Sequence, residues 1–147
     1  MSRTFGRIAC AALLLAIGYT AGRAAGPATV AYAQSQNTRV FELRTYTANE
    51  GKLDALQSRF RDHTAKLFEK HGIRNIGYWT PRDAPLAQNT LIYIVAHESP
   101  DAAKASWAAF RADPDWLKAR TASEVDGKLA AKVESIYLNP TDFSPMK

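Results

Sequence analysis

VFELRTY, at residues 40–46, is the stretch that decides the fold. Mainly apolar side chains alternate along it with charged side chains and a tyrosine, and residues two apart lie on the same face of a β-strand. The stretch therefore predicts a strand whose faces carry Phe41, Leu43 and Thr45 on one side and Glu42, Arg44 and Tyr46 on the other.

A helix is predicted next, from Asn49 as its capping residue to His71, with Gly72 in the usual stop position. Apolar residues recur at steps of three and four, which is typical of a helix with one buried stripe. The stripe consists of Leu53, Leu56, Phe60, Leu67 and Phe68.

Two strands follow this helix. Residues 73–80 form the first, which ends where Pro81 prevents further ladder bonding, and residues 90–97 form the second. Residues 91–96 are apolar on both faces, so this strand needs cover on both sides. We expect helices on one side and a second copy of the chain on the other.

Ser99-Pro100-Asp101 and Asp113-Pro114-Asp115 each have the composition of a helix start, with a capping side chain, a proline and an acid in the first turn. A last strand is predicted over residues 133–138. The order strand, helix, strand, strand, helix, strand predicts an α+β domain over residues 39–140, followed by a tail over 141–147.

The N-terminal residues differ in kind from this domain. Arg3 and Arg7 precede an apolar run at 8–19, and small residues lead to Ala33. The pattern is typical of a secretory signal peptide cleaved after Ala33, with a short linker at 34–38. A run of about a dozen apolar residues is too short to span a bilayer core of roughly 30 Å.

We therefore expect a periplasmic or secreted protein that does not stay inserted in a membrane after cleavage. An uncleaved membrane anchor and a mitochondrial presequence are the alternatives.

Charge and cysteine content exclude several function classes. Three of the 19 basic residues lie in the leader, whereas all 14 acidic residues follow it, which leaves 16 basic against 14 acidic. So balanced a charge predicts no nucleic-acid partner. The single cysteine, Cys10, also lies in the leader, so the mature chain would have no disulfide and no thiolate nucleophile.

Several short motifs resemble the NIPSNAP family across residues 39–140. In chain order they are Phe41-Glu42-Leu43-Arg44-Thr45-Tyr46, Gly51-Lys52-Leu53, Gly77-Tyr78-Trp79-Thr80, Asn89 before an apolar strand, and Asp113-Pro114-Asp115-Trp116. The resemblance implies a ferredoxin-like βαββαβ domain with an antiparallel four-stranded sheet, which pairs with a second copy as a dimeric α/β barrel. No catalytic motif carries over from the family.

Five residues are candidates for ligand binding: Glu42, Arg44, Tyr46, His63 and Trp79. We expect the first three to point into the space between two sheets. Arg44 would either pair with Glu42, of the same or the partner chain, or bind an anion beside the Tyr46 hydroxyl. His63 lies at the edge of the apolar stripe, as a packing residue or a proton shuttle. Trp79 precedes a proline-rich loop, where a pocket mouth could form.

The histidines have no ligand spacing such as His-x-x-x-His, so neither a metal nor another cofactor is expected. His71 would interact with the end of its helix, and His97 would be exposed at the rim next to Glu98.

Two function classes remain. The first is an exported homodimeric module that binds a small apolar or anionic ligand or a partner protein. The alternative is a cofactor-independent enzyme of the dimeric α/β barrel type, similar to monooxygenases or isomerases, and it rests on fold-level analogy. The sequence does not decide between them, because it contains no recognisable set of acid, base and nucleophile.

Overall fold

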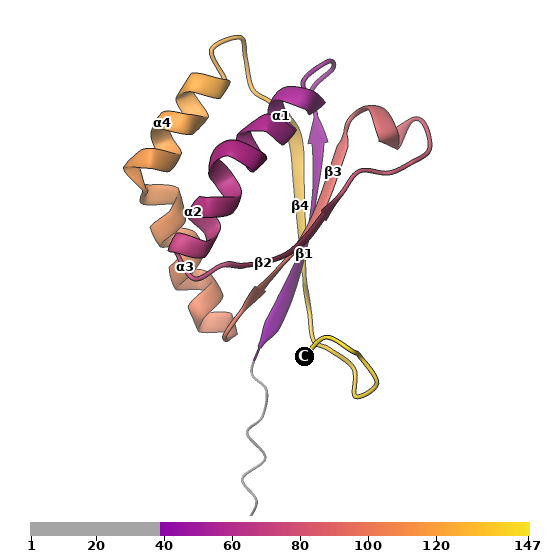
Figure 1. The fold of residues 1–147 in the computed structure, drawn as a ribbon, viewed down its shortest axis with the longest axis vertical. Helices are drawn as coiled ribbons and strands as arrows, with labels where there is room; N and C mark the ends of the chain where they lie inside the picture. The colour runs from indigo at the N-terminus through magenta and orange to yellow at the C-terminus, as the bar shows by residue number, and fades with distance from the viewer. Residues whose placement is uncertain (1–38) are drawn as a thin grey trace, which may run out of the picture. The chain divides into compact units, whose positions relative to one another are not determined.

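The computed structural model describes residues 39–147, which form one antiparallel sheet with helices (Figure 1). The strands are β1 (Val40–Ala48), β2 (Arg74–Trp79), β3 (Thr90–His97) and β4 (Ala130–Leu138). Their order across the sheet is β2-β3-β1-β4, so β1 and β3 are central. The predicted α+β class and ferredoxin-like order of elements are confirmed.

The helical segments are α1 (Leu53–Arg59), η1 (Phe60–Thr64), α2 (Ala65–Lys70), η2 (Leu86–Gln88), α3 (Pro100–Ala112) and α4 (Pro114–Ser123). The first three follow one another without a break, and η1 is a π-helical turn within them. A π turn contains more residues than an α turn, so it changes which residues face the sheet. The Thr64 hydroxyl donates to the carbonyl of Arg59, five residues back, at 3.2 Å.

The first helix begins at Leu53, so the predicted start at Asn49 is wrong. Asn49 instead ties the end of β1 to the start of β4. Its backbone N–H donates to the carbonyl of Leu129 at 2.8 Å, and its side-chain amide donates to the carbonyl of Lys128 at 2.7 Å. Both bonds use donors of Asn49, whereas a helix cap would use its side-chain oxygen as an acceptor, and Asn49 therefore joins two strands here.

The two later helix starts are confirmed. The hydroxyl of Ser99 accepts from the backbone N–H of Ala102 at 3.1 Å, which caps α3. Asp113 caps α4 by accepting from the N–H of Asp115 at 2.7 Å. The Asp113 carboxylate also bonds His71 Nε2 at 2.6 Å, so His71 links the end of the first helix to the start of α4.

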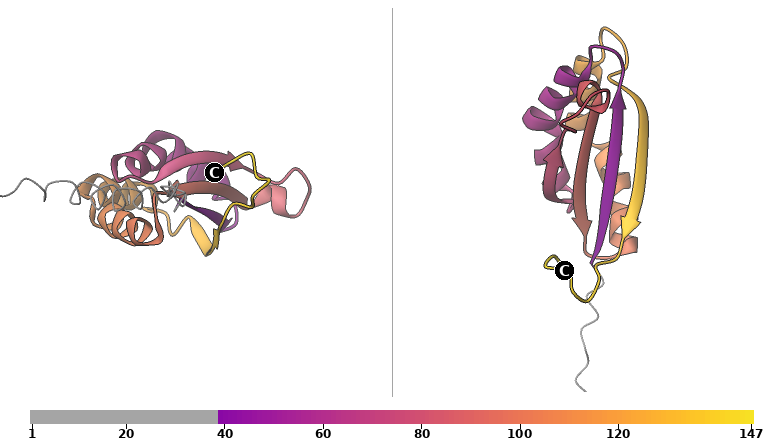
Figure 2. Two further views of the ribbon diagram at one scale, coloured as in Figure 1. Left: turned by 90° about the horizontal axis from the view of Figure 1, so that it is seen from below. Right: turned by 90° about the vertical axis from the view of Figure 1, so that its right-hand side faces the viewer.

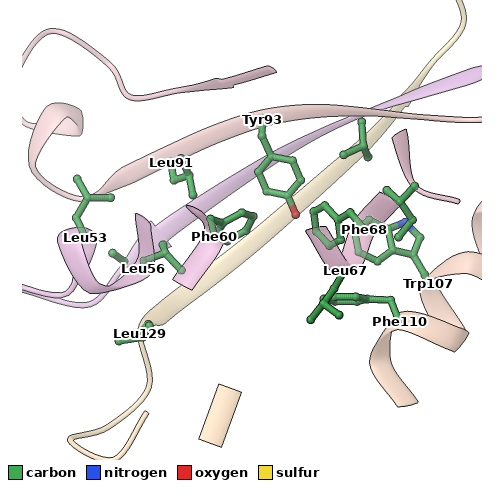
Figure 3. Close-up of a cluster of buried hydrophobic side chains, with 13 residues drawn as sticks. Leu53, Leu56, Phe60, Leu67, Phe68, Leu91, Tyr93, Trp107, Phe110 and Leu129 are labelled. Atoms are coloured by element: carbon green, nitrogen blue, oxygen red, sulfur yellow. The ribbon is translucent and has the colours of Figure 1, made fainter. Parts of the chain in front are cut away.

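The core lies between the helices and one face of the sheet. Tyr93 of β3 is fully buried at its centre and points toward the rings of Phe60 and Phe68 (Figure 3), whose centroids lie 5.1 and 5.9 Å from its own. Trp107 and Phe110 of α3 close the other side of this cluster. Aromatic side chains thus supply most of the buried volume that fixes the helices on the sheet.

Glu42, Arg44 and Tyr46 lie on the helix-covered face of β1. Arg44 is directly opposite Tyr93 in the strand pairing, and Trp107 of α3 donates to Glu42. The expectation that this face points between two sheets is therefore wrong. Alternation separates the two faces of a strand but does not say which one the helices cover.

The other face of the sheet has no helix over it (Figure 2). Ile94, Leu43 and Ile136 lie side by side across β3, β1 and β4 on this open face, and Ile136 is 57% exposed. Residues 141–147 lie at the end of the sheet that is lowest in Figure 1, where Met146, Phe41 and Ile94 line a small hollow. The open face is therefore largely apolar and exposed.

Within residues 39–147, no helix combines the length and apolar character that a bilayer span requires. The predicted signal peptide and the linker at 34–38 lie outside the described residues.

Candidate functional site

A pocket of about 300 Å³ opens between the helices and the β1–β4 side of the sheet. Its volume is at the lower end of the range for small-molecule sites. Cationic and aromatic side chains dominate its lining, which consists of Arg44, Tyr46, Arg59, Phe60, Thr64, Phe68, Trp107, Phe110, Arg111, Trp116, Arg120, Glu124, Lys128, Ala130 and Val133.

Beneath this pocket lies Glu42, which is only 1% exposed. Its Oε1 accepts from Arg44 Nη1 at 2.6 Å and from the Ser135 hydroxyl at 2.5 Å, and its Oε2 accepts from Trp107 Nε1 at 2.6 Å and contacts His97 Nε2 at 3.0 Å. Burial alone would raise the pKa of Glu42, but hydrogen bonds from His97, Ser135, Arg44 and Trp107 outweigh it and lower the pKa to about 2. Glu42 is therefore an ionised structural anchor.

His97 is buried, so the prediction that it is rim-exposed is wrong. α3 turns back over the end of β3, and the ring of Trp107 lies 6.0 Å from that of His97. An ionised carboxylate can only accept, so His97 must carry its proton on Nε2 to bond Glu42.

Arg44 is held rigidly at the floor of the pocket. Besides its bond to Glu42, its guanidinium carbon lies 4.5 Å from the ring centroid of Trp107 and 5.8 Å from that of Tyr46. These contacts fix the plane of the guanidinium. Its Nε–H is buried and has no acceptor among the described residues.

Arg59 repeats this arrangement on α1. Its side chain is 5% exposed, and its Nη1 donates to Glu124 at 2.9 Å and to Ser123 at 3.2 Å. The guanidinium lies 5.2 Å from the ring centroid of Trp116. Burial acts to raise the pKa of Glu124, but the hydrogen bond from Arg59 outweighs burial, so the pKa lies below its ordinary value and Glu124 is ionised. The Nε–H of Arg59 is also buried without an acceptor in the part of the chain described.

The charges around the pocket do not balance. Five cationic side chains line it, whereas one carboxylate, Glu124, lines it and a second, Glu42, lies beneath, which leaves a surplus of three positive charges. Aromatic rings such as Phe60 and Phe68 occupy the space between the charges, with centroids 6.1 Å apart. Such a lining suits an anion with an apolar body.

The structure brings together three of the five residues predicted as a site. Arg44 and Tyr46 line the pocket, and Glu42 supports Arg44, so the predicted Glu42–Arg44 pair forms within one chain. His63 is exposed on η1 and lines no pocket described here.

Trp79 lies apart from Arg44, and it is 52% exposed. Its ring packs on Gly77, where a Cβ atom would come within 2.5 Å of it. It lines a separate pocket of about 370 Å³ with Phe60, Arg61 and Tyr78, at the β2 edge of the sheet.

Sequence reasoning missed Arg59, Trp107 and Trp116. Most basic residues of the first helix have the spacing of a solvated face, but Arg59 stands next to Phe60 and three residues after Leu56 of the apolar stripe. That position is a signal, because a cation at the border of a buried stripe can bury its stem against apolar side chains. Trp107 and Trp116 have the spacing of core aromatics, and both also contribute to the core.

The chain was compared with known proteins. The NIPSNAP family model matches residues 41–145. A NIPSNAP family protein from Agrobacterium tumefaciens shares 26% identity at a TM-score of 0.65, over 76% of this chain and 96% of that one. A NIPSNAP-like domain protein from Burkholderia xenovorans shares 20% identity at a TM-score of 0.63, over 74% and 90%.

SnoaB, a cofactor-independent oxygenase from Streptomyces nogalater, shares 19% identity at a TM-score of 0.50, over 74% of this chain and 98% of its own, and the likeness concerns the fold alone. No protein with a curated description matches the chain. The family match spans all four strands and all the described helices, and it confirms the resemblance seen in the sequence motifs: the chain belongs to the NIPSNAP family.

Proposed function

We propose that this protein is a binding module for a small organic anion, which it holds in the pocket between its helices and sheet. The observation that carries the proposal is Arg44, a guanidinium fixed by Glu42 and Trp107 whose buried Nε–H has no acceptor within residues 39–147. A buried donor left unpaired costs free energy, and an anionic ligand would supply the acceptor.

Binding is favoured over catalysis because of the state of Glu42. It is the buried carboxylate nearest the pocket floor, but all its hydrogen bonds hold it ionised with a pKa of about 2, so it is a poor proton acceptor near neutral pH. Glu124 is likewise engaged, by Arg59. The cofactor-independent enzyme expected as the alternative has only the shared fold in its favour.

A second copy of the chain is the proposed cover for the open face of the sheet. The row of Ile94, Leu43 and Ile136 would otherwise be in contact with water, and two such faces are complementary because each is flat and apolar. This arrangement leaves the pocket accessible, since the pocket lies on the opposite, helix-covered face.

Export of the module is proposed on the leader sequence alone. A signal peptide cleaved after Ala33 would release a domain that begins at Gln34 and works outside the cytoplasm. N-terminal sequencing of the protein from its own host checks this point, and a product that retains Met1 in the membrane fraction would contradict it.

Native mass spectrometry of protein from its own host tests the binding proposal. We expect a co-purified anion that is released on denaturation. In the Arg44→Gln variant its affinity should fall about tenfold or more, as for the loss of a charge-assisted hydrogen bond.

The matched control is Arg82→Gln, which removes one positive charge from an exposed position that lines none of the pockets described. It should retain the ligand. Equal retention by the Arg44 variant and its control would refute the proposal, and chemical conversion of the bound compound by the protein would favour the enzyme instead.

A further inference from the structure

The two buried arginines of the pocket lie over opposite ends of a row of aromatic rings. Trp107, Phe110 and Trp116 form this row, with centroids 5.8 Å apart for the first pair and 4.6 Å apart for the second. Arg44 lies over Trp107 at one end, and Arg59 lies over Trp116 at the other. The two guanidinium groups are therefore separated by an apolar surface.

The two arginines have the same surroundings, namely one carboxylate partner and one donor that is unpaired within residues 39–147. One carboxylate of the chain neutralises each guanidinium, Glu42 for Arg44 and Glu124 for Arg59. Each guanidinium also has one buried Nε–H that finds no acceptor among the residues of the described domain. One acidic group on a ligand could satisfy only one of these donors. Arg111, Arg120 and Lys128 add the surplus of positive charge that a second acidic group would balance.

We infer that the ligand is a diacid, a small molecule with two carboxylates joined by an apolar spacer. One carboxylate would accept from Arg44 and the other from Arg59, with the spacer against the aromatic row. The inference rests on the proposed function, and it adds the number and the separation of the acidic groups.

A compact dianion such as phosphate fits this arrangement less well. It carries its charge at one point, so it would reach one guanidinium and leave the other Nε–H unpaired. A monoacid with an apolar body would likewise leave one of the two Nε–H donors unpaired. The site therefore discriminates by the distance between charges as well as by their number.

Titration calorimetry with matched probe pairs tests the inference. Terephthalate and benzoate differ by one carboxylate on a rigid ring, and adipate and hexanoate differ by one on a flexible chain whose reach can adjust. At constant ionic strength, we expect at least one diacid to bind about tenfold or more tightly than its monoacid, the gain from a second charge-assisted contact.

Arg59→Gln should reduce that ratio to about threefold or less, because it removes the second contact selectively. Arg82→Gln removes the same charge at an exposed site that lines none of the pockets described and should leave the ratio unchanged. Thermal unfolding of each variant shows whether the fold is intact, and the comparison of probes on the unmodified protein does not depend on any variant.

The outcomes separate this inference from the proposed function. If monoacids bind as tightly as their diacids, or if inorganic phosphate binds more tightly than both diacids, the diacid inference is wrong while anion binding stands. If no anionic probe binds and no anion co-purifies, both are wrong.

Discussion

Glu42 receives hydrogen bonds from β1, β3, β4 and α3, so a single carboxylate connects elements far apart in the sequence. A buried charge is tolerated only when it is paired and fully bonded. The free energy of unfolding should therefore depend on the ionisation of this one group.

Acidification tests that dependence. The folded-state pKa of about 2 lies below the ordinary 4.5, so the stabilisation is complete above pH 4.5 and is lost as the pH falls toward 2. The wild type should lose about 3 kcal/mol of unfolding free energy across this range through Glu42 alone. In Glu42→Gln this contribution is absent, so the stability gap between the two proteins should close in acid.

Urea unfolding at a series of pH values from 7 to about 2.5 measures the gap, with linear extrapolation to water. Glu50→Gln, at an exposed turn position, is the control and should follow the wild type. A gap that stays constant with pH would mean that Glu42 is not ionised in the folded protein.

Trp107 combines two roles, as a hydrogen-bond donor to Glu42 and as the ring under Arg44. Trp107→Phe keeps an aromatic ring but removes the donor and some volume. We expect a loss of about 2 kcal/mol in unfolding free energy, measured by circular dichroism in urea. Trp79→Phe, at a half-exposed ring, should cost about 0.5 kcal/mol or less. Equal losses in the two variants would contradict the assigned role of Trp107.

Among the elements, α3 carries the side chains that join the core to the pocket, including Trp107 and Phe110. Its start depends on Ser99, whose hydroxyl caps the N–H of Ala102. Ser99→Ala should lower the unfolding free energy by about 1 kcal/mol, and Ser99→Thr should restore most of it because threonine is also a capping residue. Urea unfolding decides the point, and two equally stable variants would show that the cap contributes nothing.

Local periodicity predicted the elements well. The bounds of β3 and the starts of α3 and α4 follow from apolar alternation and capping residues, which act over a few residues. Arg44 and Tyr46 were found in the same way, because both lie on one strand.

The rest of the site depends on long-range packing. Alternation separates the two faces of β1 but does not tell which one meets the helices, because the face with charged residues is the one that the helices cover. His63 lies within the π turn at η1, which breaks the regular rotation of 100° per residue on which its predicted place at the edge of the apolar stripe was based, and it is exposed. Arg59 precedes that turn and is buried because α4 packs beside it, where Ser123 and Glu124 accept its hydrogen bonds. His97 is buried by α3, an element that begins after it in the sequence.

At the scale of the whole molecule, the open face of the sheet is covered by no helix of the described residues. Ile136→Lys places a charge in the middle of the proposed dimer contact, at a side chain that is 57% exposed and so replaceable without loss of the fold. We expect the wild type to be a dimer and this variant a monomer in light scattering at micromolar concentration.

Leu117→Lys is the matched control, at a side chain of α4 that is 47% exposed and lies away from the open face. It should remain dimeric. A monomeric wild type, or dissociation of both variants alike, would refute the second copy as the cover of the sheet.

The pairing of β1 with β4 determines when the proposed binding pocket is complete. The Ser135 hydroxyl meets Glu42 across 93 residues of sequence, and Ala130 and Val133 of β4 complete the pocket wall. Contacts of such long sequence separation close late, because the entropy of the intervening chain opposes them. A chain passing through a membrane unfolded would therefore arrive empty, and the composition of the compartment in which it folds would decide what it binds.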